Sequence, residues 1–322
     1  MRAPDPTGPV AVLTQLDDVT ADYVIAELHD RGVPVVRLDP GRPDGVTFAA
    51  QAGPGAWHGP LRTPTRAVDL GTVRAVYHRR PSVYQAPRQL DDQQRRFTAA
   101  QVRHGLSGLL AALPDCLYVN HPHHNWNAEY KPRQITTAVA AGLDVPPTLV
   151  TNDPGAARAF AEEHGPVVYK PLRATDYRED GEPRTVWVRP VDPADLDERI
   201  AVCPHLFQQQ VEKVADVRVA AVGRRLFATR IGVDGDHLDW RLDYRRVTFS
   251  PTEVPTEVRE GIHRYLSALG LVFGAFDFGL SAEGRWRFYE CNPNGQWAFV
   301  DEATTRAITS ALADLLEKGT SP

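Results

Sequence analysis

Two apolar stretches near the end of the chain, Val272–Leu280 and Trp286–Asn292, are joined by a short segment that contains Gly284. Stretches of this length that are rich in aromatic residues and flank a glycine-containing turn predict a β-hairpin. The strands of a hairpin run antiparallel, and their side chains alternate between the two faces. This feature therefore commits the last part of the chain to an antiparallel sheet.

Polar residues interrupt one face of this predicted hairpin. Glu290 and Asn292 are two positions apart, so they point to the same side, and Asp277 can reach that side from the partner strand. Oxygen ligands gathered among apolar neighbours such as Phe278 repel one another and lose hydration unless a cation compensates. Mg²⁺ is the natural candidate, because it prefers oxygen ligands and is commonly shared with substrate phosphates. The spacing is equally compatible with Asp277 and Glu290 as solvent-facing strand residues.

The segments before the hairpin change in type along the chain. Val10–Leu13, Thr20–Arg31 and Val35–Leu38 predict a β-α-β start. The expected order is α/β, then α+β, then an antiparallel sheet with helices. The corresponding units are an N-terminal domain at residues 1–122, a central lobe at 123–205 and a C-terminal lobe at 206–322.

Helices and strands in each unit follow from the periodicity of apolar residues. The expected helices lie near Arg88–Ala112, Ala128–Ala141, Pro154–His164, Val254–Leu269 and Glu302–Leu316. The further strands are expected near Val73–Tyr77, Leu117–Val119, Val167–Lys170, Phe207–Val211, Asp216–Val222 and Leu226–Val233. Between Leu117–Val119 and the helix that follows, His121, His123 and His124 fit no standard zinc spacing, so we expect them to order a loop.

Composition and charge exclude several classes of protein. The net charge of −5 provides no general attraction for nucleic acid or anionic membranes. No segment approaches the roughly 18 to 20 apolar residues that span a bilayer, and Met1–Pro9 lacks the apolar core of a signal peptide. We therefore expect a cytoplasmic protein with neither a membrane nor a nucleic-acid partner. Cys116, Cys203 and Cys291 are isolated, so buried, reduced thiols are expected.

Isolated cations stand at the ends or on the faces of expected strands. Lys170 ends an apolar strand, where phosphate is the partner we expect, although a surface lysine that extends into solvent is the usual alternative. Lys131 is ambiguous by itself. Arg218 and Arg230 lie on neighbouring strands and could bind phosphate bidentately, or each could form a cross-strand salt bridge.

A charged segment that contains Trp240 follows these strands. It contains Asp239, Trp240, Arg241, Arg245 and Arg246. The cations beside an aromatic ring suggest contact with an acidic substrate, and the alternative is a charged loop. The chain has no Walker loop, no G-x-G-x-x-G after its first strand and no G-x-S-x-G, which argues against P-loop, Rossmann-dehydrogenase and serine-hydrolase functions.

Taken together, these residues resemble an ATP-grasp ligase, in which a nucleotide lies between two α+β lobes that follow an N-terminal pre-ATP-grasp domain. Val168-Tyr169-Lys170-Pro171 is similar to the strand whose lysine contacts ATP phosphate, and Lys131 is similar to the earlier lysine. Phe207–Glu212 resembles the hinge around adenine, which implies nucleotide contacts by four of its residues: Gln208, Gln209, Val211 and Glu212.

The same resemblance assigns roles to the remaining polar residues. Arg218 and Arg230 match arginines near the phosphates. Asp277, Glu290 and Asn292 match the magnesium ligands. The implied cofactors are ATP and Mg²⁺. One departure is that Leu172–Pro183 has Gly181 alone where many ATP-grasp ligases carry a glycine-rich phosphate lid.

More narrowly, the chain resembles graspetide synthetases, the microviridin-type ATP-grasp maturases of ribosomally made peptides. The four segments that carry this resemblance are Val76–Pro81, Asn120–Pro122, Asp239–Arg241 and Glu290–Trp297. The implied reaction activates Asp or Glu side chains of a precursor as acyl phosphates and crosslinks them to Ser or Thr hydroxyls or Lys amines. Arg218, Arg230 and Arg241 would be catalytic, whereas Asp239, Trp240, Arg245 and Arg246 would bind the acidic core.

Other points remain open at the level of sequence. The precursor's leader would dock elsewhere, along a strand edge or in a helix groove. The sequence also leaves open whether the protein forms a homodimer. One rival function is a ligase that adds an amino acid to a protein or small carboxylate, and another is a nucleotide-bound scaffold that has lost catalysis.

Overall fold

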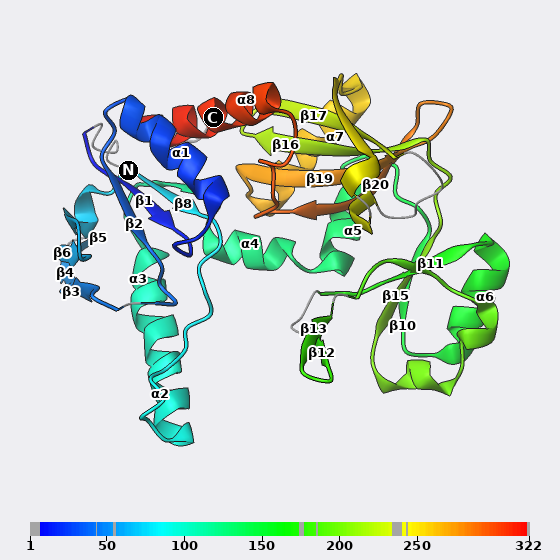
Figure 1. The fold of residues 1–322 in the computed structure, drawn as a ribbon, viewed down its shortest axis with the longest axis horizontal. Helices are drawn as coiled ribbons and strands as arrows, with labels where there is room; N and C mark the ends of the chain where they lie inside the picture. Colours follow the sequence, from blue (N-terminus) through cyan, green and yellow to red (C-terminus); the bar gives the residue numbers. More distant parts are fainter. Residues whose placement is uncertain are drawn as a thin grey trace.

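A four-stranded parallel sheet of order β2-β1-β8-β9 forms the N-terminal part of the computed structural model, which describes residues 7–42, 44–53, 56–173, 177–184, 186–233, 240–242 and 244–320. The helix α1 (Val19–Asp30) lies over this sheet (Figure 1), and it buries Val24 and Leu28. The strands are β1 (Val10–Leu13), β2 (Val35–Leu38), β8 (Ala75–His78) and β9 (Leu117–Val119). Short strands fill most of the segment between β2 and β8: β3 (Thr47–Phe48), β4 (Gln51–Gly53), β5 (Ala56–His58), β6 (Pro60–Arg62) and β7 (Ala67–Asp69).

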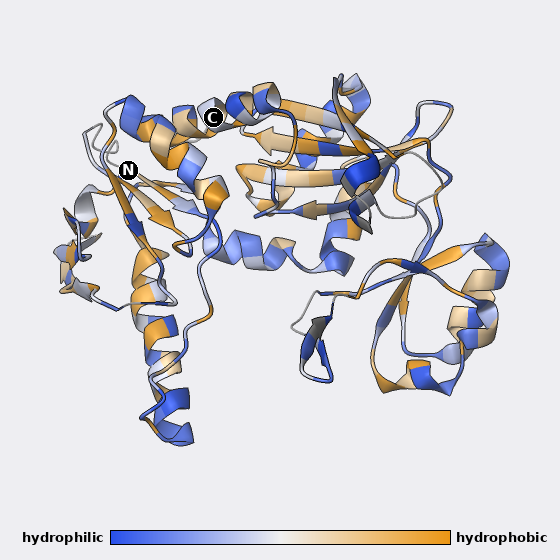
Figure 2. Ribbon diagram, viewed as in Figure 1, coloured by the Kyte–Doolittle hydropathy of each residue, from blue (hydrophilic) through white to orange (hydrophobic). Residues whose placement is uncertain are grey.

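The expected long helix of this domain is divided and begins later than predicted. Helix α2 (Asp92–Val102) starts at a capping box in which Asp91 and Gln94 exchange hydrogen bonds. A π-helical turn at 103–107 separates it from α3 (Gly108–Leu110). Helix α2 extends away from the sheet (Figure 1), and its outer end is hydrophilic (Figure 2), in agreement with its lack of buried residues.

The C-terminal part is a five-stranded antiparallel sheet of order β18-β17-β16-β19-β20. Its apolar back face packs against α7 (Thr256–Leu269) and α5 (Lys131–Ala140) around Phe276, Phe278 and Phe288. The predicted strands and hairpins of this part are confirmed. They are β16 (Ala215–Val222), β17 (Arg225–Val233), β18 (Val247–Thr252), β19 (Phe273–Leu280) and β20 (Trp286–Asn292).

The central lobe is built on a second antiparallel sheet of order β10-β15-β11-β14, against which α6 (Pro154–His164) packs. Its strands are β10 (Thr148–Thr151), β11 (Val167–Lys170), β14 (Arg189–Pro190) and β15 (His205–Gln209). We predicted β15 as the start of the third unit, but it pairs with β10 and β11, so this sheet extends to Gln209. The segment after β11 in which Gly181 is the single glycine contains a small hairpin of β12 (Tyr177–Glu179) and β13 (Glu182–Arg184).

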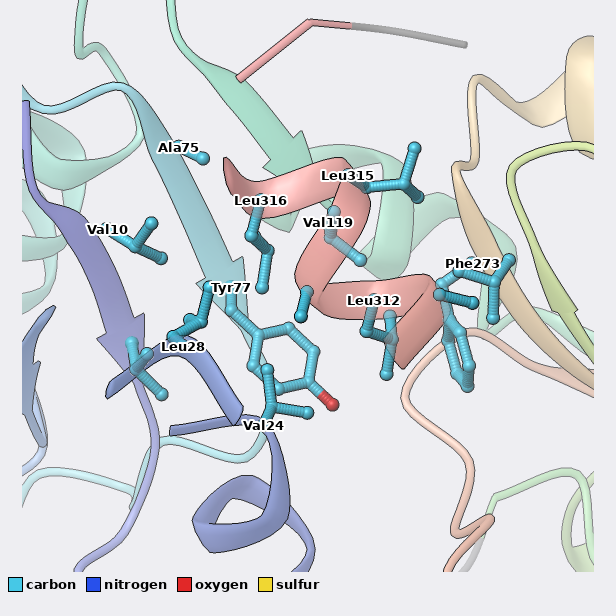
Figure 3. Packing of buried hydrophobic residues seen from close by; sticks show 14 of the residues in the cluster. Val10, Val24, Leu28, Ala75, Tyr77, Val119, Phe273, Leu312, Leu315 and Leu316 are labelled. Carbon is cyan, nitrogen blue, oxygen red and sulfur yellow. The ribbon is translucent and has the colours of Figure 1, made fainter. Parts of the chain in front are cut away.

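The N-terminal domain and the C-terminal sheet share one hydrophobic core. Figure 3 shows Tyr77 of β8 beside Leu312 and Leu316 of α8 (Glu302–Lys318), with Phe273 of β19 at the edge of the same cluster. Helix α8 also lies along α1 (Figure 1), where Arg31 donates to Asp314 (2.6 Å). The front face of the C-terminal sheet is therefore covered partly by the N-terminal domain.

Two local predictions are corrected. The segment expected to be a histidine-containing loop forms helix α4 (Pro122–Ala128), because Pro122 suits the first turn and the ring of His121 accepts from the backbone N–H of His123. Cys203 is exposed rather than buried, since it follows a surface 3₁₀ turn, whereas Cys116 is half-buried and Cys291 is buried.

No helix in the described part of the chain is both long and apolar enough to cross a membrane.

Candidate active site

The predicted oxygen ligands meet on the front face of the C-terminal sheet. Asp277 and Glu290 are direct cross-strand partners, and Asn292 lies opposite Ala275 on the same face. The amide nitrogen of Asn292 donates to Glu290 Oε1 (3.1 Å) and lies 3.4 Å from Asp277 Oδ2. Within the described ranges, no group of three or more His, Cys, Asp or Glu side chains is arranged to hold a metal ion, so the donor set here is two carboxylates and one amide.

Each carboxylate is held by a cation. Glu290 pairs with Lys131 at the first turn of α5, and Asp277 accepts two hydrogen bonds of 2.6 Å from Arg218. Burial opposes ionisation of Glu290, but the attraction of Lys131 and the hydrogen bonds from Lys131 and Asn292 prevail and lower its pKa to about 2. Burial raises the pKa of Asp277, although Arg218 acts in the opposite direction. Both carboxylates are thus desolvated, and the neighbouring cations favour their ionised forms.

Lys170 approaches this face from the central lobe. Its ammonium donates to Gln208 Oε1 (2.5 Å) and lies 4.4 Å from the centre of the Tyr289 ring. A register shift after Asp277 leaves Tyr289 without a cross-strand partner, which turns its ring toward the central lobe. Burial lowers the pKa of Lys170 to about 8, even though Glu290 favours the charged form. Lys170 therefore lies at the end of β11, as predicted.

Lys131, Lys170, Gln208 and Tyr289 line one narrow pocket between the two lobes, with a volume of about 10 Å³. A space of this size holds about one water molecule at most. A nucleotide could enter this pocket only if the central lobe moved away from the C-terminal sheet.

The remaining residues of the predicted hinge lie elsewhere. Side chains alternate along β15, so Gln208 faces Lys170 while Gln209 faces α6 and donates to the backbone oxygen of His164. Gln209, Val211 and Glu212 line a separate cavity of about 410 Å³ on that side. Of the four predicted nucleotide-binding side chains, Gln208 is the one in contact with Lys170.

The two predicted strand arginines do not lie on one face. Arg230 is the register partner of Val217, whereas Arg218 is the partner of Thr229. Directly opposed residues share a face, and Val217 is buried against the back of the sheet. The structure therefore places Arg230 on the face opposite Arg218 and Asp277.

The charged segment that contains Trp240 contacts the site through an aromatic cluster. Trp240 is buried and stacks on Phe299 (5.3 Å between ring centres), and the guanidinium of Arg218 lies 5.6 Å from the centre of the Phe299 ring. Arg241 lies over Trp240 and is close enough to Asp277 to favour its ionised form. The buried indole thus contacts Arg241 directly and Arg218 through Phe299. Arg245 and Arg246 are exposed in the following turn, and Asp239 lies outside the described residues.

Residues that the sequence did not single out connect this site to the N-terminal domain. Arg79, which is 1% exposed, donates to the backbone oxygen of Asn294 and to the side-chain oxygen of Gln296. Arg218 donates to the backbone oxygen of Gln296 (2.9 Å). Asn120 donates to the backbone oxygens of Phe273 (2.9 Å) and Pro293 (3.1 Å). The segments of Arg79 and Asn120 were visible in the sequence, but the contacts of these two residues, each across more than 150 positions, were not.

Comparison with known proteins identifies this architecture. The model for the MvdD pre-ATP grasp domain matches residues 10–125. An ATP-grasp ligase from Chryseobacterium gregarium, associated with ribosomally synthesised and modified peptides and solved with ADP and a leader and core peptide, is 26% identical. It superposes with a TM-score of 0.88 over 98% of this chain and 99% of that chain. The chain is an ATP-dependent ligase with the ATP-grasp fold.

Two further structures are similar to this ligase over nearly its whole length. The macrocyclase MdnC from Microcystis aeruginosa MRC, bound to its precursor peptide MdnA, is 27% identical with a TM-score of 0.84, covering 97% of this chain and 99% of that chain. The ATP-grasp ligase PsnB, solved with the precursor PsnA2 and AMPPNP, is 26% identical with a TM-score of 0.72, covering 98% and 99%. No curated protein matches the chain. The predicted fold, with a pre-ATP-grasp domain before two ATP-grasp lobes, is confirmed.

Proposed function

We propose that this ligase activates Asp or Glu side chains of a ribosomally made precursor peptide as acyl phosphates. It then joins them to Ser or Thr hydroxyls or to Lys amines of the same peptide, in the cytoplasm where the precursor is made. The observation that carries the proposal is the facing pair of Asp277 and Glu290, with Lys131, Lys170 and Arg218 around it. Similarity over nearly the whole chain to ligases solved with precursor peptides supports a peptide substrate.

ATP and Mg²⁺ are the cofactors that suit these residues. Asp277, Glu290 and Asn292 would hold the metal ion, since a carboxylate whose pKa is about 2 stays ionised and hard oxygen donors are the ligands that Mg²⁺ selects. Lys131 and Lys170 would face the phosphates. When bound, Mg²⁺ neutralises charge on the β- and γ-phosphates during transfer.

The proposed reaction has two steps, phosphoryl transfer and acyl transfer, and it needs no covalent enzyme intermediate. A carboxylate oxygen of the peptide bonds to the γ-phosphorus as the bond to the β–γ bridging oxygen breaks, which releases ADP. A hydroxyl oxygen or amine nitrogen then attacks the acyl carbon and loses its proton as phosphate departs. Lys170 and Arg218 stabilise the charge on the phosphoryl group, and closure of the central lobe excludes water that would hydrolyse the acyl phosphate.

Mass measurement tests the proposal against its rivals. The enzyme is incubated with ATP, Mg²⁺ and a precursor encoded next to it, which is expected to have an acidic core rich in Thr and Ser. We expect the peptide to lose the mass of one water molecule per crosslink while ADP accumulates. A gain in mass would indicate ligation of a free amino acid, and an unchanged peptide without ADP would indicate a scaffold.

Arg241 provides a prediction about the core peptide. Replacing Arg241 with Ala is expected to raise KM for the precursor about 10-fold, because a charged hydrogen bond is lost, while ATP binding persists. Peptide titrations with mass detection and a separate nucleotide-binding assay measure the two effects. Arg306→Ala, an exposed arginine on α8, serves as the control. Unchanged crosslinking by the Arg241 variant would reject its role.

A further inference from the structure

Helix α5 approaches the strand that carries Glu290 and Asn292 with two polar side chains. Lys131, its first residue, pairs with the carboxylate of Glu290. Gln134 lies three positions later, close to one helical turn, so both side chains project from the same face of the helix. Gln134 is 4% exposed and, together with Lys131 and Lys170, lines the pocket between the lobes. Lys131 has a part in the proposed reaction, and the contacts of Gln134 indicate a part for this residue as well.

The amide group of Gln134 bonds to the backbone of β20 between two of the proposed metal ligands. Its Oε1 accepts from the backbone N–H of Cys291 (3.0 Å). Cys291 stands between Glu290 and Asn292, whose side chains share the front face, while its own side chain is buried in the core on the back face. A hydrogen bond to this N–H therefore holds the short piece of backbone from which both ligands project.

Strand β20 needs such a partner because it is the outer strand of the five-stranded sheet. An outer strand directs part of its N–H and C=O groups away from its neighbour, where the sheet cannot satisfy them. On this edge the N–H of Phe288 donates to Asp144 O (2.7 Å), and the N–H of Cys291 donates to Gln134. These two bonds flank the register shift at Tyr289, so the backbone that turns from the apolar core to the metal-ligand face is held on both sides.

The nitrogen of the same amide binds the junction of α4 and α5. Nε2 of Gln134 donates to the backbone oxygen of Ala128 (2.7 Å), the last residue of α4. The last carbonyl groups of a helix have no partner within it, and Ala128 is fully buried, so this oxygen depends on a protein donor. One side chain thus connects α4, α5 and β20, and it uses its donor and its acceptor at the same time.

We propose that Gln134 is a positioning residue that holds Glu290 and Asn292 in the geometry that binds the metal ion. This inference rests on the proposed function. Groups that orient metal ligands without touching the metal typically contribute about 10- to 100-fold to metal affinity or activity. The alternative is a buried hydrogen bond that stabilises the fold and contributes nothing to metal binding. The experiment separates these two roles.

The experiment measures metal binding directly on the full-length enzyme. Mn²⁺, which shares the oxygen-ligand preference of Mg²⁺, is titrated in the presence of ADP, and free Mn²⁺ is followed by electron paramagnetic resonance. Deuterium exchange of the peptide that contains Cys291 reports on its hydrogen bond. Gln134→Met preserves the length of the side chain without its hydrogen bonds, and Gln134→Asn keeps an amide that is too short for both partners. The matched control is Gln101→Met, at an exposed position of α2.

Gln134→Met is expected to weaken Mn²⁺ binding about 10-fold and to speed exchange around Cys291, while the affinity for ADP without metal stays the same. Gln101→Met should match the wild type. Gln134→Asn should lie between the two, and it provides the comparison if Gln134→Met does not fold. Wild-type affinity for Mn²⁺ in the folded Gln134 variants overturns the inference, and so does unchanged exchange around Cys291. A wild-type enzyme that binds Mn²⁺ no more tightly than Glu290→Gln would instead overturn the metal site of the proposed function.

Discussion

Glu290→Gln is expected to remove crosslinking while leaving the protein folded. Glutamine preserves the size of the side chain but removes a negative charge that pairs with Lys131 and is expected to hold the metal ion. Loss of one preorganised electrostatic contact at a reacting phosphate should lower kcat by about 100-fold or more. The rate of mass loss of the precursor and the rate of ADP release measure this effect.

The same hairpin offers a matched control. Glu283 lies in the turn between β19 and β20, is exposed and accepts a hydrogen bond from Ser281. Glu283→Gln makes the identical chemical change away from the ligand face and should retain the rate of the wild type. Circular dichroism and the midpoint of thermal unfolding establish that both variants are folded. Full activity of Glu290→Gln would contradict the assignment of the metal site.

Asn120→Ala is expected to destabilise the protein strongly. The buried side chain of Asn120 accepts from the backbone N–H groups of Val272 (2.7 Å) and Phe273 (2.8 Å), and it donates to Pro293 O and Phe273 O. Alanine would leave these backbone groups without partners, each at a cost of about 1–3 kcal/mol. We expect the free energy of unfolding to fall by about 3 kcal/mol or more, as measured by urea denaturation.

Asn127 on α4 provides the comparison, since it is exposed seven positions further along the chain. Asn127→Ala should change the free energy of unfolding by no more than about 0.5 kcal/mol, as is usual for surface positions. If Asn120→Ala unfolds at the same urea concentration as Asn127→Ala, the hydrogen bonds of Asn120 do not hold the two domains together.

Local periodicity predicted the part of the site that lies within one hairpin. Trp286–Asn292 is a strand over its whole predicted range, Glu290 and Asn292 share a face as alternation requires, and Asp277 meets Glu290. The register shift at Tyr289, which separates Phe288 on the back face from Glu290 on the front face, was not predicted, because alternation alone would put both side chains on one face. The position of Lys170 followed from the apolar strand that it ends.

Relations between strands that are distant in sequence could not be predicted in the same way. Arg230 seemed a neighbour of Arg218 from its place on the next strand, but the register, which turns it to the back face, is fixed by pairing rather than by composition. For the same reason β15 was assigned to the wrong sheet. The contacts of Arg79 and Asn120 depend on how the N-terminal domain packs on residues near Gln296, for which no local pattern exists.

The first strand and the last helix of the chain pack into the same core, since residues of β1 and α8 lie in one cluster with Tyr77. During synthesis, the core that α1 begins on one side of the N-terminal sheet is therefore completed only after α8 has emerged from the ribosome. The central lobe draws its core from residues between Ala157 and Phe207, so it can fold earlier. The domain translated first therefore completes its core last, and loss of α8 is expected to destabilise that domain.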